Sequence, residues 1–77
     1  MTITVKFFAS LRETLNRDTC TVNSSDATTA ADVWRIATDN HELPNNTLVA
    51  INMDYANAEQ SVSDGDEVAF FPPVTGG

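Results

Sequence analysis

An alternation of apolar and polar residues at the start of the chain constrains its fold most strongly. Ile3, Val5 and Phe7 are apolar, and the residues between them are polar. A period of two predicts a strand that buries one face against a core. Such a strand needs neighbouring strands and a covering layer, so the rest of the chain has to supply both.

One later segment has the pattern of a helix that covers a sheet. Thr29 and Asp32 form a capping box with Asp in place of the usual Glu, which predicts a helix over residues 30–39. Apolar side chains, among them Val33 and Ile36, recur on one face at the spacing that docks a helix on a sheet. We therefore expect a sheet wrapped round one main helix.

Shorter segments complete this layout. Further strand patterns occur at residues 18–22, 48–52 and 67–71. Turn or helical-turn signals occur at residues 10–15, with Ser10 as the predicted cap, at 53–54 and at 64–66. The order β, turn, β, α, β, β indicates a mixed sheet in an α+β domain over residues 1–71, followed by an extended tail over residues 72–77.

The size of the chain limits what it does by itself. With 77 residues it has room for one small core. A domain near this size buries only about 60% of the surface that its unfolded chain exposes, so a deep private active site would remove contacts that stability needs. We expect a carrier or a binding module that is not an enzyme on its own.

The charge balance narrows the class of partner. Acidic residues outnumber basic ones by eleven to four, and the formal net charge is −7. Such a surface repels phosphate backbones and anionic lipids, so neither nucleic acid nor a membrane is an expected partner. A partner protein with a basic face would be attracted instead.

The cysteine content and the hydropathy pattern bear on the compartment. Cys20 is the only cysteine, so no internal disulfide is expected, and no Cys/His cluster has metal-ligand spacing. No stretch has the pattern of a signal peptide or of a membrane span. The expected location is therefore the cytoplasm, and no bound metal is expected.

The C-terminal residues carry the most specific chemical signal. Gly76 and Gly77 are two of only three glycines in the sequence. Pro72-Pro73 ends the preceding strand and Val74-Thr75 continues the extension, which predicts a tail that threads a narrow channel. A frayed terminus without a task is the alternative interpretation.

The same two glycines indicate acyl chemistry at Gly77. Because the tip has no Cβ atoms, a nucleophile can approach the terminal carbonyl once its carboxylate has been activated. Activation as an acyl adenylate requires ATP, and the sequence contains no phosphate-binding glycine loop. Another protein would have to supply that step.

Both ends of the chain resemble one known family. The segment from Val5 to Glu13 and the segment from Asp64 to Gly77, which contains Phe70-Phe71-Pro72-Pro73, are similar to the small subunit of molybdopterin synthase, the MoaD family. The middle of the chain is similar only in pattern. The nearest rivals are the thiamine thiazole sulfur carriers (ThiS-like), which usually lack the Phe-Phe-Pro-Pro run, and ubiquitin-like modifiers that would be conjugated through Gly77.

The resemblance implies a ubiquitin-like β-grasp fold and a role as a sulfur carrier in molybdenum cofactor biosynthesis. Gly77 would be adenylated by a MoeB-like partner related to ubiquitin-activating enzymes and then converted to a thiocarboxylate. That partner, and not this chain, would use ATP and a sulfur donor, and no cofactor would be bound here. The tail would enter the active site of a MoaE-like large subunit, in a heterotetramer, and give sulfur to cyclic pyranopterin monophosphate.

Two aromatic residues are candidates for a docking surface. Phe8 and Phe71 fall on the polar side of their strands by alternation, and the first and last strands of a β-grasp fold lie side by side. The two rings are therefore predicted to form one exposed apolar patch, with Tyr55 adjoining and the tail residues 72–75 continuing it toward the partner. The alternative is that the loops of the chain itself cover these strand edges.

Overall fold

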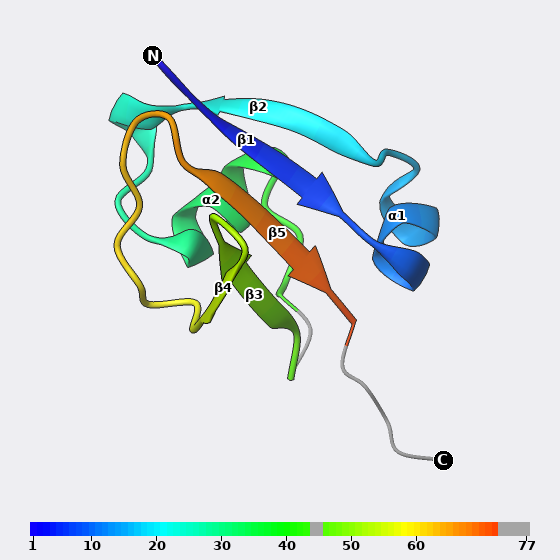
Figure 1. Ribbon diagram of the computed structural model, residues 1–77. Helices are drawn as coiled ribbons and strands as arrows, with labels where there is room; N and C mark the ends of the chain where they lie inside the picture. Colours follow the sequence, from blue (N-terminus) through cyan, green and yellow to red (C-terminus); the bar gives the residue numbers. More distant parts are fainter. Residues whose placement is uncertain (44–45, 73–77) are drawn as a thin grey trace.

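The central element of the structure is one mixed sheet. The computed structural model describes residues 1–43 and 46–72, and within them five strands run in the order β2-β1-β5-β3-β4 (Figure 1). The strands are β1 (Thr2–Phe7), β2 (Thr19–Asn23), β3 (Leu48–Ile51), β4 (Asp54–Ala56) and β5 (Glu67–Phe71). β1 and β5 are parallel neighbours in the centre, and the other adjacent strands pair antiparallel. The sheet is thus the predicted mixed one, and its first and last strands lie side by side.

Helices complete the domain on one side and at one end of the sheet. They are α1 (Ala9–Leu15), a short 3₁₀ turn η1 (Ser24–Asp26) and the main helix α2 (Ala30–Ala37). In Figure 1, α2 crosses behind β1 and β5, and α1 follows the end of β1. The prediction of one main helix packed on a sheet is confirmed.

Aromatic rings form the centre of the core between α2 and the sheet. Phe7 and Phe70 are buried neighbours on β1 and β5, and the Trp34 ring of α2 meets both edge-on, with centroid distances of 5.8 Å and 5.0 Å. Ile3 and Val5 of β1 are fully buried on the same face. Apolar burial of this kind is the dominant favourable contribution to folding.

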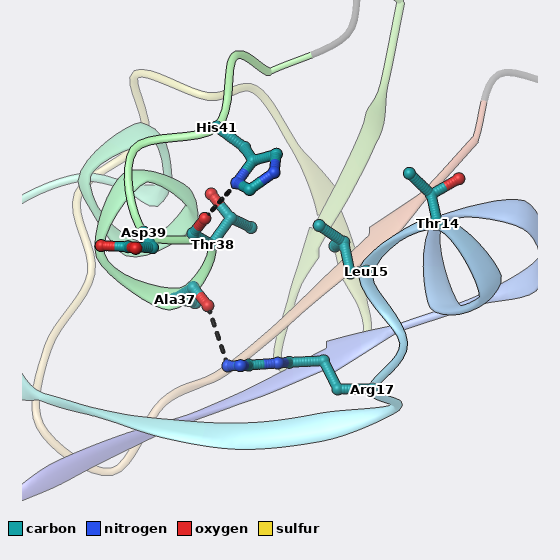
Figure 2. A pocket seen from close by; sticks show the side chains of 7 residues that line it. All are labelled: Thr14, Leu15, Arg17, Ala37, Thr38, Asp39 and His41. Atoms are coloured by element: carbon teal, nitrogen blue, oxygen red, sulfur yellow. Dashed lines mark hydrogen bonds between the residues drawn. The ribbon is translucent and has the colours of Figure 1, made fainter.

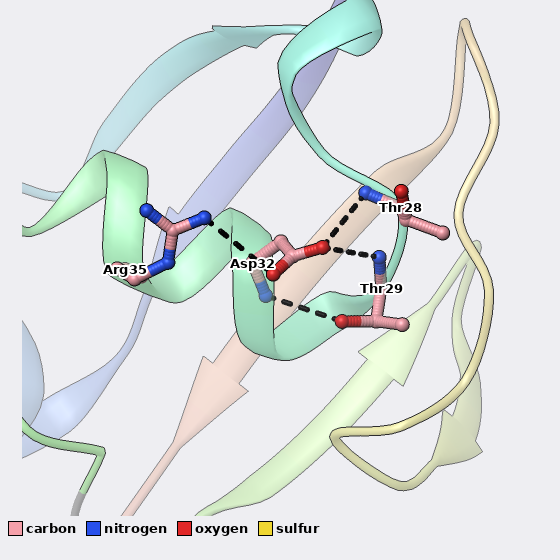
Figure 3. Close-up of polar contacts among 4 residues, drawn as sticks. All are labelled: Thr28, Thr29, Asp32 and Arg35. Atoms are coloured by element: carbon pink, nitrogen blue, oxygen red, sulfur yellow. Dashed lines mark hydrogen bonds and ion pairs between the residues drawn. The ribbon is translucent and has the colours of Figure 1, made fainter.

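The start of α2 confirms the predicted capping box (Figure 3). The hydroxyl of Thr29 accepts a hydrogen bond from the Asp32 backbone N–H, and the Asp32 carboxylate accepts bonds from the N–H groups of Thr28 and Thr29 at 3.0 Å and 3.3 Å. Arg35 lies 3.5 Å from the same carboxylate. The backbone bonds, and secondarily Arg35, lower the pKa of Asp32 from its ordinary value.

The end of α2 comes at Ala37, two residues before the predicted end at Asp39. Asp39 and Asn40 have φ angles of 57° and 68°, a left-handed conformation that stops a helix. Arg17, in the connection between α1 and β2, donates a hydrogen bond of 3.1 Å to the carbonyl of Ala37 (Figure 2). A cation is favourable there because the last carbonyls of a helix carry partial negative charge.

A second pair of hydrogen bonds fixes the loop after α2. The Nδ1 atom of His41 bonds to the carbonyl of Thr38, and the indole N–H of Trp34 donates to the His41 carbonyl at 3.0 Å. Thr14 and Leu15 of α1 line the opposite side of a pocket of about 170 Å³ at this point (Figure 2). Arg17, Thr38 and His41, which line this pocket, therefore take part in ending α2 and in fixing the loop after it.

Two local predictions were wrong. Ser10 does not cap α1, because the helix begins at Ala9 and Phe8 occupies the cap position without a side-chain hydrogen bond. The tight turn lies at Asn52-Met53 instead of Met53-Asp54, and it is followed by β4, a strand that the sequence patterns did not predict. In both cases backbone pairing with neighbouring strands overrides a weak local signal.

Candidate functional site

Phe8 and Phe71 form one stacked pair on the outer face of the sheet. Their ring centroids lie 4.7 Å apart and the ring planes differ by 11°. Phe8 is 40% exposed and Phe71 is half-buried. The predicted proximity of the two rings is confirmed.

The register of the central strands explains why these rings meet. Phe7 of β1 pairs with Phe70 of β5, so the next residue of each strand lies beside the other. The N–H of Phe8 donates a hydrogen bond of 3.1 Å to the Phe70 carbonyl, which extends the ladder to this point. Because side chains alternate along a strand, Phe8 and Phe71 point away from the core that Phe7 and Phe70 enter.

Small side chains make the floor of a groove beside this pair. Ala50 of β3 pairs directly with Ala69 of β5, and both lie on the outer face, outside the core cluster. Each is nonetheless at most 7% exposed, because larger side chains surround it. Because each side chain is a single methyl group, the two alanines leave a depression between the larger side chains around them.

The far wall of the groove comes from the β3–β4 hairpin. Tyr55 pairs with Ala50 across the hairpin and is 79% exposed, and Met53, at the hairpin tip, is 89% exposed. With Phe8, Phe71 and Glu67 these residues line a groove of about 230 Å³. We call the apolar residues Phe8, Ala50, Met53, Tyr55, Ala69 and Phe71 the outer apolar patch.

Charged groups lie along the edge of the outer apolar patch. Glu67 lines the groove and forms an ion pair of 3.5 Å with Lys6 of β1. Asn52 accepts a hydrogen bond from the Glu67 N–H at 3.0 Å and donates one to Asp66 at 2.9 Å, which fixes the hairpin against the start of β5. The patch is thus an apolar surface with the Glu67–Lys6 ion pair at its edge and a hairpin that is hydrogen-bonded to the start of β5.

The structure places only part of the predicted site. Phe8, Phe71 and Tyr55 come together, and Pro72 follows β5 directly and is half-buried. Predicted tail residues 73–77, including Gly76 and Gly77, lie outside the described residues.

Sequence reasoning missed three members of the patch: Ala50, Ala69 and Met53. Alternation indicates that Ala69 faces outward, but a single alanine does not indicate a groove without its partner in register. Met53 had a detectable signal, because a large apolar side chain is unusual in a tight turn.

The described residues offer few other sites. No group of three or more His, Cys, Asp or Glu side chains within residues 1–43 and 46–72 has the arrangement to bind a metal ion. Of the helices in that part of the chain, none is long and apolar enough to cross a membrane. Within the described residues, the outer apolar patch is therefore the candidate functional site.

Comparison with known proteins assigns the chain to a family. A model of the ThiS family matches residues 5–77. The molybdopterin synthase sulfur carrier subunit of Haemophilus influenzae is 39% identical, and that of Escherichia coli is 38% identical, each over 97% of this chain and 99% of the relative.

Solved structures agree on the fold. SAMP1 from Haloferax volcanii superposes with a TM-score of 0.82 over 100% of both chains, at 28% identity. A complex of subunits 1 and 2 of molybdopterin-converting factor from Helicobacter pylori contains a chain with a TM-score of 0.66 over 100% of both chains, at 22% identity. The fold is thus the ubiquitin-like β-grasp, as the resemblance implied. The chain belongs to the ThiS family, and the molybdopterin synthase sulfur carrier subunits of Haemophilus influenzae and Escherichia coli are its relatives.

Proposed function

We propose that this chain carries sulfur for molybdopterin synthesis as a thiocarboxylate on Gly77. The observation that carries the proposal is the similarity to the two bacterial sulfur carrier subunits, which extends over 97% of the chain at 38–39% identity. The ThiS family match also runs to Gly77, so it includes the Gly-Gly end. A terminus without side chains suits both activation and attack at the carbonyl.

The proposed chemistry divides between this chain and its partners. A MoeB-like enzyme uses ATP to convert the Gly77 carboxylate to an acyl adenylate, with release of pyrophosphate. Sulfide-level sulfur from a donor then attacks the adenylate carbonyl, AMP leaves, and Gly77 becomes a thiocarboxylate. In the active site of a MoaE-like large subunit, that sulfur bonds to cyclic pyranopterin monophosphate, and hydrolysis of its bond to the Gly77 carbonyl returns the carboxylate. The chain supplies the reagent, and the partners supply the acid, base and substrate-binding groups.

The outer apolar patch is the proposed docking surface for these partners. Exposed contiguous apolar area marks partner sites in small proteins, and aromatic side chains are frequent anchors of such interfaces. Phe8 and Phe71 lie where β5 leads into Pro72 and the tail, so docking there would aim the tail into a partner. The Helicobacter pylori chain of the same fold was solved in complex with subunit 2. Assembly of two copies of this chain with two large subunits would give a heterotetramer.

Intact-mass measurement tests the sulfur-carrier proposal. Protein produced with the activating enzyme, ATP and a sulfur source should gain the mass difference between sulfur and oxygen. A variant lacking Gly77 should gain nothing, whereas Cys20→Ser should gain the same mass as the wild type, because the sulfur is on the terminus. An unchanged wild-type mass, or a gain that needs Cys20, would contradict the proposal.

The ThiS family match is also consistent with an alternative pathway, in which the carried sulfur goes to the thiazole of thiamine. The discriminating assay supplies the loaded carrier with a molybdopterin synthase large subunit and cyclic pyranopterin monophosphate. Formation of molybdopterin supports the proposed cargo. Loading without any transfer in that assay would favour the thiazole pathway.

A protein modifier is the second candidate function. It is favoured by the fold match with SAMP1 from Haloferax volcanii, a small archaeal modifier protein, at a TM-score of 0.82 and 28% identity. Modification would join Gly77 to target lysines through isopeptide bonds. Adducts in cells that disappear on deletion of Gly77 would establish this function beside sulfur transfer.

A further inference from the structure

The β3–β4 hairpin has an unexpected residue at its tip. Ile51 pairs with Asp54, so the loop contains only Asn52 and Met53, and their φ angles are 52° and 72°. Two-residue hairpin loops with positive φ at both positions favour Asn followed by Gly. Asn52 fits this preference, but Met53 adopts a left-handed conformation that its Cβ disfavours.

Neither the turn nor the core explains a methionine at this position. Met53 is 89% exposed and is not part of the core cluster. The neighbouring Asn52 has a structural role, because its side chain bonds to Asp66 and to the Glu67 N–H. The side chain of Met53 instead lines the groove over Ala50 and Ala69. Strained backbone and exposed apolar surface thus coincide at the residue that forms one wall of the groove.

We propose that Met53 is a partner-contacting residue that closes the groove over an apolar side chain of the docked protein. The proposal rests on the proposed function, which requires the same surface to dock on an activating enzyme and then on a large subunit. An unbranched thioether side chain adapts to different contact surfaces. Methionine at the exposed hairpin tip, opposite the stacked Phe8 and Phe71 rings, therefore suits a surface with two successive partners.

The chemistry of the groove specifies its occupant. The alanine floor and the aromatic walls accept one apolar side chain, and the volume of about 230 Å³ leaves room for one. Glu67 lines the groove with Lys6 as its ion-pair partner at 3.5 Å, and the chain as a whole has a net charge of −7. The occupant is thus an apolar side chain of the partner with a basic side chain next to it.

The test separates the stability of the hairpin from its contact with the partner. Met53→Gly restores the preferred turn and removes the contact, so its Tm should rise by roughly 3 °C while its affinity for a molybdopterin synthase large subunit falls about tenfold. Met53→Leu keeps an apolar side chain and should bind like the wild type. Calorimetric titration and thermal unfolding of the full-length chain measure both quantities.

Each outcome decides one question. Equal affinities of Met53→Gly and the wild type would overturn the inference, and a lowered Tm would contradict the claim that the turn is strained. Met53→Asn tolerates the left-handed conformation without the flexibility of glycine, so weak binding of this variant excludes loop flexibility as the cause. If the wild type does not bind a large subunit at all while its terminus still accepts sulfur, the proposed partner fails independently of Met53.

Discussion

Each of the two Phe-Phe dipeptides of this chain has one ring in the core and one ring on the outer face of the sheet. Phe7 and Phe70 are at most 1% exposed, and their rings stack in the core with centroids 6.0 Å apart. Phe8 and Phe71 stack on the other face of the sheet at 4.7 Å, where solvent reaches them. Identical side chains one residue apart therefore contribute to stability on one face and to a proposed interface on the other.

The register of β1 and β5, and not the residue type, decides which rings enter the core and which lie on the outer face. β1 and β5 pair in parallel with Phe7 opposite Phe70, so both inner rings reach Trp34 and both outer rings reach each other. A slip of one residue in either strand would exchange the faces. Mutations on one face of the sheet should therefore leave the role of the other face unchanged.

Phe70→Ala should have the largest effect, and on stability. Removing the ring leaves a cavity beside Phe7 and Trp34, and truncation of buried phenylalanine lowers the free energy of unfolding by about 3–5 kcal/mol. A small domain has little stability beyond that, so a large unfolded fraction is expected. Denaturant titration followed by Trp34 fluorescence measures the change. A loss below about 1 kcal/mol would mean that the inner face does not carry the fold.

Phe71→Ala should leave the fold intact and weaken docking. The ring is half-buried on the outer face, so we expect a loss of about 1 kcal/mol or less in the free energy of unfolding. As an aromatic anchor of the outer apolar patch, it should contribute about 2 kcal/mol to binding of the large subunit or the activating enzyme. Titration of each partner measures this. Unchanged affinity for both would remove the patch as a docking surface.

Asp32→Asn should have the smallest effect, and only on the pH dependence of stability. The pKa of Asp32 is lowered in the folded state by backbone bonds from Thr28 and Thr29. Its stabilising contribution is therefore present above the ordinary pKa of 3.8 and is lost as the pH falls through the folded value. In a Tm series, the two proteins should differ at neutral pH and converge in acid. Partner affinity at neutral pH should not change, since Asp32 lies on neither of the compared faces.

Local patterns predicted most of the elements correctly. The alternation of β1, the capping box of α2 and the turn before β5 each depend on residues close in sequence, so their signals are complete within a short window. β4 was missed because its hairpin loop reads Asn-Met where Asn-Gly would have signalled the turn. The end of α2 was placed too late because the apolar spacing does not reveal the left-handed conformation of Asp39 and Asn40. The bond from Arg17 to the Ala37 carbonyl, which supports this end, comes from a distant segment.

The sequence by itself predicted the acyl chemistry that we propose for Gly77, and its alternation indicated the inward or outward direction of the aromatic residues at the ends of β1 and β5. Gly76-Gly77 and the alternation of Phe7, Phe8, Phe70 and Phe71 are local facts that need no contact with other segments. Only the tertiary structure decided that Ala50 lies opposite Ala69 and that the hairpin tip faces the Phe8–Phe71 pair. The groove exists because strands distant in sequence pair in one register, and pairing of that kind is set by the packed core as a whole.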